Sequence, residues 1–509
     1  MAISYIASTM PVIRPLTMKE ILLSDLLSGA LSRDGSTSLQ RQIYEVVRRA
    51  VLDHTLVPGQ KMPSSRQLAL ELGISRITVS LAYDRLVAES YLTTTTGSGT
   101  FVAETGASPR AAPGPSTPVK AWGAIASRGE ALSRGRGGLP QHAGAFVPGV
   151  ADASLFPFHI WKRLLNRHIS KSNLGLAGYA SDGAGYFPLR EAIANYLGIS
   201  RSVVCDAEQV IVTTGTHQSI DLCARMLADV GDRALVEDPC HWAFPSVLTA
   251  AGVVVEPLQV DASGADLRHS EISNRTKLAA VSPSHQYPTG VVMPLSRRLE
   301  LLELAREHGI WILEDDYDSE FRYDGTPLPS LQGLDADGHV IYMGTFSKAT
   351  FPGMRMSYMV VPRPLAKAFS NACAEIYRPG QLHIQAALAD LISDGHFSQH
   401  IRRMRLEYAS RQEALRVAID RRIGEQISLS TAKAGLHCFG QLRPSVDMAR
   451  LAEEATRLGL ILRRPHFVAP NQTARVNAIV LGFGGVSLEN IEPGVVRLAQ
   501  AIEHALKKR

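Results

Sequence analysis

The sequence predicts an α/β protein with two parts, a small helical N-terminal domain and a larger domain built on a mostly parallel sheet. Helical patterns and one glycine-rich hairpin pattern fill the first part of the chain. From about residue 144 onward, short apolar runs alternate with helical patterns, as in a sheet covered by helices on both faces. A chain of 509 residues also exceeds the size of one hydrophobic core.

The composition is that of an ordinary globular protein, with 45% hydrophobic and 20% charged residues. The net charge of +5 permits nucleic-acid binding without requiring it. The five cysteines are scattered and form no Cys-x-x-Cys pair, which favours reduced thiols. No apolar run has the length of a membrane span, and the N-terminus lacks a signal-peptide pattern. We therefore expect a cytoplasmic protein with no membrane partner.

The N-terminal domain, residues 38–103, is predicted from three helical patterns followed by a hairpin pattern. A tight turn at Gly73 joins the second and third helices, which is the arrangement of a helix-turn-helix. β-branched residues around Gly97 and Gly99 then predict a hairpin, the wing of a winged helix. The helices are expected at residues 39–53, 66–72 and 76–89.

A winged helix binds DNA by placing its third helix in the major groove. Arg76 in the first turn of that helix can read guanine, and Thr78 can contact a phosphate or a thymine methyl group. The start of the second helix offers amides and the cation Arg66 to phosphates. Ordinary surface arginines on a small helical domain are the alternative. The candidate DNA-binding residues are Ser64, Ser65, Arg66, Ser75, Arg76, Thr78 and Gly97.

Three segments of this domain resemble the GntR-family winged helix: Leu56-Val-Pro-Gly-Gln-Lys-Met-Pro-Ser-Ser-Arg66, Leu72-Gly-Ile-Ser-Arg-Ile-Thr-Val79 and Gly97-Ser-Gly-Thr-Phe-Val102. The resemblance implies that the partner of this domain is operator DNA. Ser90 departs from the family pattern, which usually has glycine before the aromatic residue, and this departure affects a turn more than DNA contact.

Residues 104–143 are expected to be a flexible linker. They are rich in alanine, proline, glycine and serine, so they cannot bury enough apolar surface to fold alone. Their arginines, Arg128, Arg134 and Arg136, are expected to be solvated, with contact to DNA phosphates as the alternative.

The large domain, residues 144–509, should place its site at the carboxyl ends of its strands, because open α/β sheets bind ligands there. Polar residues follow most of the predicted strands directly. Helices at residues 217–229 and 296–308 fit between strands. The strands are expected at residues 210–212, 234–236, 253–255, 278–281, 310–313 and 340–343.

The clearest site candidate follows the sixth strand. Lys348 comes after the hydroxyl residues Thr345 and Ser347, and Arg355 follows seven positions later within Pro-Gly-Met-Arg. A lysine there suits a Schiff base with an aldehyde cofactor, while the hydroxyl and guanidinium groups suit that cofactor's phosphate. A surface lysine in a polar loop is the alternative.

Two further strand ends carry groups that suit a phosphorylated, planar cofactor. Gly215, Thr216 and His217 follow the first strand and begin a helix, where amides and a hydroxyl can bind phosphate. His241 follows the second strand and can stack on a ring. Taken alone, each is more often a turn or a surface histidine.

The fifth strand ends in a cluster of acids that includes Asp315, with Tyr317 two residues on. A carboxylate there can pair with a pyridinium nitrogen, and the tyrosine hydroxyl can reach a phenolic ring oxygen. Such a cluster could instead hold a divalent metal ion. We expect none, because no second oxygen-rich cluster or glycine loop accompanies it.

The order of these motifs resembles the fold-type I pyridoxal phosphate (PLP) enzymes, the aminotransferase family. The resemblance implies a PLP-dependent transferase-like fold, PLP as cofactor and Lys348 as its Schiff-base lysine. It also implies that Tyr179 reaches the cofactor phosphate of a partner subunit, hence a head-to-tail homodimer. Combined with the winged helix, the chain resembles the MocR subfamily of bacterial regulators, on motifs such as Glu314-Asp-Asp-Tyr-Asp-Ser-Glu-Phe321.

Two positions depart from the family pattern. His241 stands where relatives usually carry an aromatic residue, and Val480 stands where aminotransferases carry the arginine that clamps a substrate carboxylate. Arg463 and Arg464 are the candidates to substitute for that arginine. The sequence therefore supports an α-amino-acid ligand, whose carboxylate would use such an arginine, less strongly than an amine.

The resemblance implies a PLP-dependent transcriptional regulator that senses an amine, an amino-acid-type effector or PLP itself. An active aminotransferase with an accessory DNA-binding module is the alternative, because both would use the same cofactor groups. A third reading is a regulator whose large domain no longer binds PLP. The missing arginine at Val480 and the intact winged helix favour regulation.

Overall fold

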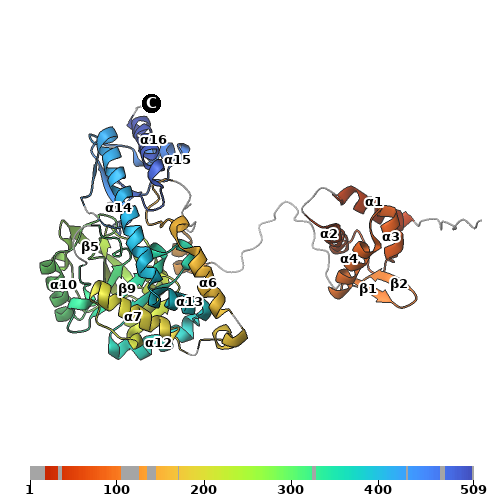
Figure 1. The fold of residues 1–509 in the computed structure, drawn as a ribbon, viewed down its shortest axis with the longest axis horizontal. Helices are drawn as coiled ribbons and strands as arrows, with labels where there is room; N and C mark the ends of the chain where they lie inside the picture. The colour runs from red at the N-terminus through yellow and green to blue at the C-terminus, as the bar shows by residue number, and fades with distance from the viewer. Residues whose placement is uncertain are drawn as a thin grey trace, which may run out of the picture. The chain divides into compact units, whose positions relative to one another are not determined.

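The computed structural model falls into two compact units, residues 1–124 and residues 125–509 (Figure 1). Within the residues that it describes, no helix is long and apolar enough to cross a membrane. The described residues are 18–32, 37–104, 125–134, 145–169, 171–180, 182–323, 328–431, 434–469 and 476–506.

The first unit contains the predicted helices and wing. A serine side chain accepts a backbone amide at the start of each of the three predicted helices, at Ser38, Ser64 and Ser75. Gly73 ends the second of them with φ of 62°, a left-handed conformation that favours glycine. The elements are α1 (Met18–Ala30), α2 (Leu39–Leu52), α3 (Ser65–Leu72), α4 (Arg76–Ala88), β1 (Leu92–Thr95) and β2 (Gly99–Val102). The winged helix predicted from the sequence is confirmed.

The additional helix α1 completes the core of this unit. Its Leu23 and Leu27 are buried, and the helix packs against α2 and α3. Both leucines join an apolar cluster that includes Ile43, Leu68 and Val79 from the three following helices. α1 therefore covers apolar surface that those helices would otherwise expose.

The second unit is organised around an eight-stranded sheet in the order β3-β10-β9-β8-β7-β4-β5-β6. The strands β4, β5, β7, β8 and β9 pair in parallel, which confirms the mostly parallel sheet. The short β10 was not predicted, and it lies antiparallel between β3 and β9. The strands are β3 (Val210–Thr213), β4 (Arg233–Asp238), β5 (Val254–Asp261), β6 (Gly264–Ala265), β7 (Thr276–Val281), β8 (Trp311–Asp316), β9 (Val340–Thr345) and β10 (Ser357–Val360).

Helices cover both faces of this sheet, and alternate residues of one strand enter different cores. On β3, Val210 and Val212 pack into one buried cluster, whereas Ile211 packs into another. This alternation is why three successive positions of the strand, residues 210–212, are apolar rather than every second one. The helices are α6 (Phe158–His168), α7 (Phe187–Arg201), α8 (Thr216–Leu227), α9 (Ala243–Ala251), α10 (Leu295–His308), α11 (Phe346–Ala349), α12 (Arg363–Tyr377) and α13 (Leu382–Ser393).

A three-stranded antiparallel sheet follows, with order β11-β12-β13, and it was not predicted. Its strands are β11 (Ile427–Leu429), β12 (His437–Leu442) and β13 (Ala478–Gly482). Figure 1 shows the long helix α14 (His396–Ile423) extending from the body of the unit toward α15 (Met448–Arg457) and α16 (Leu488–Leu506). Arg411 on α14 binds Asp152 through Nη2 at 2.8 Å and the Gly484 carbonyl through Nη1 at 2.6 Å.

Part of the predicted linker is helical. Residues 127–134 form α5 (Ser127–Arg134), which packs against α9 of the second unit. Arg128 lies on this helix and is exposed, as expected of a solvated arginine. Residues 105–124 and 135–144, with Arg136, lie outside the described residues.

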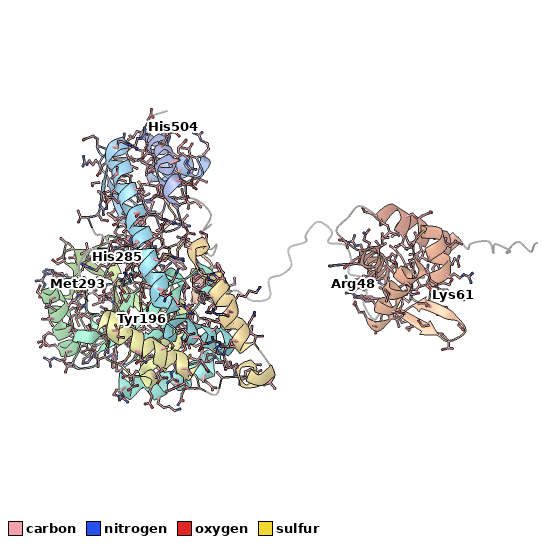
Figure 2. The ribbon with its side chains drawn as sticks, viewed as in Figure 1. Arg48, Lys61, Tyr196, His285, Met293 and His504 are labelled. Atoms are coloured by element: carbon pink, nitrogen blue, oxygen red, sulfur yellow. The ribbon has the colours of Figure 1, made fainter. Side chains whose placement is uncertain are left out.

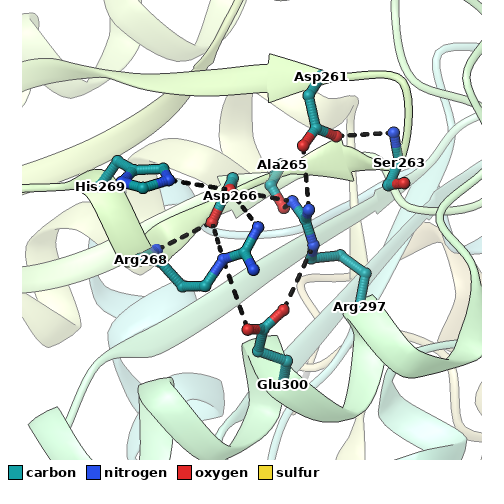
Figure 3. Close-up of polar contacts among 8 residues, drawn as sticks. All are labelled: Asp261, Ser263, Ala265, Asp266, Arg268, His269, Arg297 and Glu300. Carbon is teal, nitrogen blue, oxygen red and sulfur yellow. Dashed lines mark hydrogen bonds and ion pairs between the residues drawn. The ribbon is translucent and has the colours of Figure 1, made fainter.

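An ion-pair network fastens the edge of the large sheet to α10 (Figure 3). Arg297 reaches Asp261 at 3.0 Å, and Arg268 reaches Asp266 at 2.6 Å. Hydrogen bonds from the side chain and the backbone amide of Arg268, with the charge of Arg297, lower the pKa of Asp266 to about 2. The carboxylate of Asp266 thus stays ionised over the whole physiological range.

Candidate functional site

Lys348 lies just after the carboxyl end of β9, and its amine contacts the backbone at Gly149. Thr345 caps the short helix α11, and its Oγ1 accepts the Ser347 amide at 3.2 Å. The Lys348 Nζ donates to the Gly149 carbonyl at 2.5 Å. Gly149 has φ of 72°, and a Cβ there would lie 3.0 Å from Nζ, so the lysine's approach favours glycine. Burial lowers the pKa of Lys348, with Asp318 opposing, which favours the unprotonated, nucleophilic amine.

The two acids that end β8 have different environments. Asp316 accepts from Arg201 Nε at 2.7 Å and from the Tyr342 hydroxyl at 2.5 Å. Asp315 is also buried, yet it accepts no hydrogen bond from the described part of the chain. Burial, with the neighbouring Asp316 carboxylate, raises the pKa of Asp315 to about 8. Of the two, Asp315 is the carboxyl that a ring nitrogen can pair with.

We expect the cofactor-free protein to lose stability as pH rises from about 4 to about 8, because of Asp315. An ordinary aspartate releases its proton near pH ~3.9, whereas folded Asp315 holds it to about pH 8. Between these values the folded protein binds one more proton, so the free energy of unfolding falls by up to about 1.4 kcal/mol per pH unit. Asp315→Asn should flatten this fall in thermal unfolding, and the exposed Asp261→Asn should leave it unchanged.

Tyr317 follows these acids and contacts a buried pair. Its hydroxyl lies 3.1 Å from Nδ1 of His285, a residue of the β7–α10 loop that is labelled in Figure 2. The same Nδ1 lies 3.1 and 3.2 Å from the two carboxylate oxygens of Asp318. The ligand-type atoms of His285, Asp318 and His437 all lie within 4.8 Å of one another. These three side chains thus combine hydrogen bonding with ligand types that a metal ion accepts.

Aromatic and imidazole rings surround this group. The ring of Tyr287 lies 5.6 Å from His241, 6.0 Å from Tyr317 and 5.1 Å from His437, each distance measured between centroids. Burial, with the charge of Lys348, lowers the pKa of His241 to about 3, so this imidazole is neutral. Its Nδ1 is buried and has no hydrogen-bond partner in the described structure. A neutral ring at this position suits stacking on a planar ligand.

The side of the site formed by Arg355 and the start of α8 can hold an anion. Gly215 precedes α8 with φ of 147°, and a Cβ there would lie 3.0 Å from Nη2 of Arg355. The guanidinium therefore faces the amino end of a helix whose first residues are Thr216 and His217. Burial, with the charge of Arg355, lowers the pKa of His217. A cavity of about 660 Å³ opens here, lined by residues that include His217, Gln218 and Arg355. Cation and helix terminus together suit a phosphate.

Tyr179 and Val480 lie at the margins of this arrangement. Tyr179 is 89% exposed, and the guanidinium of Arg378, which lines the same cavity, lies 5.6 Å from its ring centroid. Val480 is buried on β13, and its amide donates to the Arg463 carbonyl at 2.8 Å. Burial raises the pKa of Tyr287 to about 12, and the charge of Arg463 opposes that rise. Arg463 is therefore both beside Val480 and close to the ring cluster.

The first unit presents a separate candidate interface for DNA. Arg66 and Arg76 are exposed, and Arg76 Nε approaches the Ser65 hydroxyl at 3.5 Å. Thr78 is half-buried on α4. A groove of about 500 Å³ between α4 and the wing is lined by residues that include Ser64, Ser65, Ser80 and Gly97. Of the predicted residues, Ser64, Ser65 and Gly97 thus line one groove, and Arg76 approaches it through Ser65. The side-chain oxygens of Ser64 and Ser75 cap helices.

Several site residues were not among those predicted. His285 and Asp318 carry the hydrogen bonds behind Tyr317, and Gly149 receives Lys348. His285 and Asp318 do follow predicted strands, so position at a strand end was a usable signal for them. Gly149 precedes every predicted strand, and no local pattern marks it.

The residues fit PLP as a bound group. A half-buried lysine, a buried carboxyl without a donor in the described structure, and an arginine facing a helix terminus match the aldehyde, the ring nitrogen and the phosphate of PLP. This match rests on the chemistry of the side chains present.

Comparisons with known proteins agree with both units. Residues 157–478 match the aminotransferase class I and II family, and residues 39–102 match the bacterial regulatory proteins of the gntR family. The chain is 37% identical to the "Probable rhizopine catabolism regulatory protein MocR" of Rhizobium meliloti, covering 92% of this chain and 95% of that one. It is 28% identical to the pyridoxine biosynthesis transcriptional regulator PdxR of Corynebacterium glutamicum, covering 93% and 98%.

Solved structures are similar to the second unit. The Pyrococcus horikoshii kynurenine aminotransferase, crystallised with PMP, has a TM-score of 0.66 and 26% identity. That comparison covers 72% of this chain and 92% of the aminotransferase. The α-aminoadipate aminotransferase LysN of Thermus thermophilus also has a TM-score of 0.66 and 26% identity, covering 74% and 97%.

Proposed function

Because this chain belongs to the MocR subfamily of GntR-type transcriptional regulators, we propose that it controls transcription by coupling an amine ligand at Lys348 to DNA binding. One observation carries the proposal: the site around Lys348 and a winged helix lie in separate units of the same chain. The effector is an amine, an amino-acid-type molecule or PLP itself. Such a ligand shifts the protein between states only by its differential affinity for them.

PLP is the proposed cofactor, and this chain's residues would hold it at three points. Lys348 would bond its aldehyde, Arg355 and the amino end of α8 would hold its phosphate, and Asp315 would pair with its ring nitrogen. When bound, PLP supplies an aldehyde that amines exchange on and a ring that withdraws electrons. Partial burial lowers the pKa of Lys348, which favours the neutral amine that exchange requires.

The position of Val480 favours regulation over turnover. Aminotransferases use an arginine there for the substrate carboxylate, and here a buried valine stands at that position. The alternative function is an active aminotransferase with an accessory DNA-binding module. Arg463, whose backbone pairs with Val480, is the residue that would favour this alternative by supplying the missing cation.

A ligand screen on the full-length, PLP-loaded protein tests the proposal. Cofactor absorbance and operator binding, followed by fluorescence anisotropy, would be recorded in the same samples. We expect at least one amine that changes both signals together. Steady conversion of an amino donor and a 2-oxo acid, with no operator binding, would establish the aminotransferase instead. Failure to take up PLP would leave only the DNA-binding half of the proposal.

A head-to-tail homodimer acting in the cytoplasm is also part of the proposal. Tyr179 is a large, highly exposed aromatic side chain close to the phosphate end of the site, which supports a role at a subunit contact. In that arrangement Tyr179 would reach the phosphate held by the partner subunit. Sedimentation of the wild type and of Tyr179→Ala would measure the dimer, and PLP affinity would measure the contact.

Arg76→Ala should weaken operator binding by about 1–3 kcal/mol and relax the preference for one base pair, because Arg76 begins the recognition helix and is exposed. The measurement is binding to the operator and to single-base variants of it. Arg49→Ala, an exposed arginine in the last turn of α2, serves as the matched control. Equal weakening on every sequence would instead assign Arg76 to a phosphate contact.

A further inference from the structure

The buried pair His285–Asp318 has no task in the function proposed above. Both side chains are almost completely buried, at 4% and 2% exposure. We propose that they are positioning residues that make Tyr317 a hydrogen-bond donor toward the cofactor's ring oxygen. Asp318 acts on His285, and His285 acts on Tyr317. The inference rests on PLP binding at Lys348, and its test separates the two.

The argument begins with the proton on Nδ1 of His285. A carboxylate can only accept a hydrogen bond, and Asp318 places two oxygens 3.1 and 3.2 Å from this nitrogen. Nδ1 must therefore carry the proton and donate it. In general, a carboxylate beside one ring nitrogen of a neutral histidine favours the tautomer with the proton on that nitrogen.

The consequence falls on Tyr317. Its oxygen lies 3.1 Å from the same Nδ1, and a nitrogen that already bears a proton cannot accept the tyrosine's hydrogen. Tyr317 can only receive a share of the Nδ1 proton, and its own hydrogen is left to point into the site. With the proton on the other ring nitrogen, Tyr317 would donate into His285 and be lost as a donor. Burial, with Asp318 and Asp315, raises the pKa of Tyr317, so the hydroxyl stays protonated.

The packing leaves the pair little freedom to rearrange. Gly435 lies directly over it with φ of 71°, and a Cβ there would come within 2.1 Å of His285 Cε1 and 2.5 Å of an Asp318 oxygen. Its amide donates to the Phe321 carbonyl at 2.7 Å, and its carbonyl accepts from the Tyr323 hydroxyl. The backbone before β12 thus holds the imidazole against the carboxylate.

A divalent cation is the competing use of the same atoms. His437 Nε2 lies 3.1 Å from the Pro288 carbonyl and must donate to it, so the buried Nδ1 has a free lone pair and no partner in the described structure. We favour the hydrogen-bonded arrangement, because Nδ1 of His285 is already within bonding distance of Asp318 and Tyr317. The titratable groups that face this network include His437, Asp315, Glu237, Lys348, Tyr287 and Tyr323.

The test measures the pH at which the absorbance of the lysine-bound cofactor changes in the full-length protein. A donor to the ring oxygen stabilises its anion, so losing the donor should move the transition to higher pH, by about one unit for one hydrogen bond. Tyr317→Phe and Asp318→Asn should both produce this shift, and the double variant should shift no further than Tyr317→Phe alone. Asp261→Asn makes the same change on an exposed carboxylate and should have no effect.

Each outcome decides between the readings. A shift in Tyr317→Phe but none in a folded Asp318→Asn overturns the inference and leaves PLP binding intact. If Asp318→Asn does not fold, His285→Phe keeps a ring and removes the nitrogen to which Tyr317 could otherwise donate. The transition should then stay near the wild-type pH, and a shift as large as that of Tyr317→Phe would overturn the inference. A wild-type transition that moves after chelator treatment would assign the atoms to a cation. A wild type without cofactor absorbance would instead refute the proposed function.

Discussion

Lys348→Ala should abolish the absorbance of the bound cofactor and remove every response of operator binding to amines. Lys348 is a half-buried primary amine at the end of β9, and its surroundings lower its pKa, as a Schiff base requires. Binding of the operator in the absence of ligand should persist, because the winged helix is a separate unit. Spectra and fluorescence anisotropy on the same PLP-treated samples measure both effects.

Two variants control for this result. Lys367→Ala removes an exposed lysine of α12 and should change neither signal. Lys348→Arg keeps a positive charge but cannot form a Schiff base, so it should also lose the absorbance. An amine response that survives in Lys348→Ala would show that the effector binds elsewhere.

Arg201→Ala should cost about 3–5 kcal/mol in the free energy of unfolding, because it leaves a buried carboxylate without its cation. Arg201 ends α7 and donates to Asp316 at 2.7 Å, to the Ser284 hydroxyl at 2.6 Å and to the Leu328 carbonyl at 2.6 Å. Removing it leaves Asp316 with the Tyr342 hydroxyl as its remaining side-chain donor among the described residues. Urea unfolding of the cofactor-free protein gives the energy.

Arg225→Ala is the matched control for that measurement. Arg225 pairs with Asp221 one helical turn away, and its side chain is 49% exposed. Solvent and salt screen such a pair, so we expect a loss below about 1 kcal/mol. Equal losses in the two variants would mean that the Arg201 contacts contribute no more than a surface pair does.

The sequence could predict what local patterns determine. Each parallel strand of the large sheet contains an apolar run in the sequence, although the ends of the strands were not predicted. Residues that directly follow a strand were useful candidates for the site. Serine caps and a glycine turn likewise marked the helices of the first unit. These features depend on neighbours in the chain, so a single sequence carries them.

What the sequence could not predict depends on pairing between distant residues. β10 has only four residues, and its place between β3 and β9 follows from long-range contacts. Asp315 could be named as a candidate from the sequence, but the contact of its neighbour Asp316 with Arg201 from α7 could not. The His285–Asp318 contact likewise joins two loops that a local pattern does not connect.

The hydrogen bond from Lys348 to the Gly149 carbonyl connects the candidate site to the backbone that follows the linker. Gly149 belongs to the first described stretch after the linker, so the bond ends on backbone that continues in sequence toward the DNA-binding unit. A chemical change at the lysine nitrogen alters the number of hydrogens that it can give to this carbonyl. If amines react at Lys348 as we propose, the reaction would therefore change a hydrogen bond to the backbone that follows the linker.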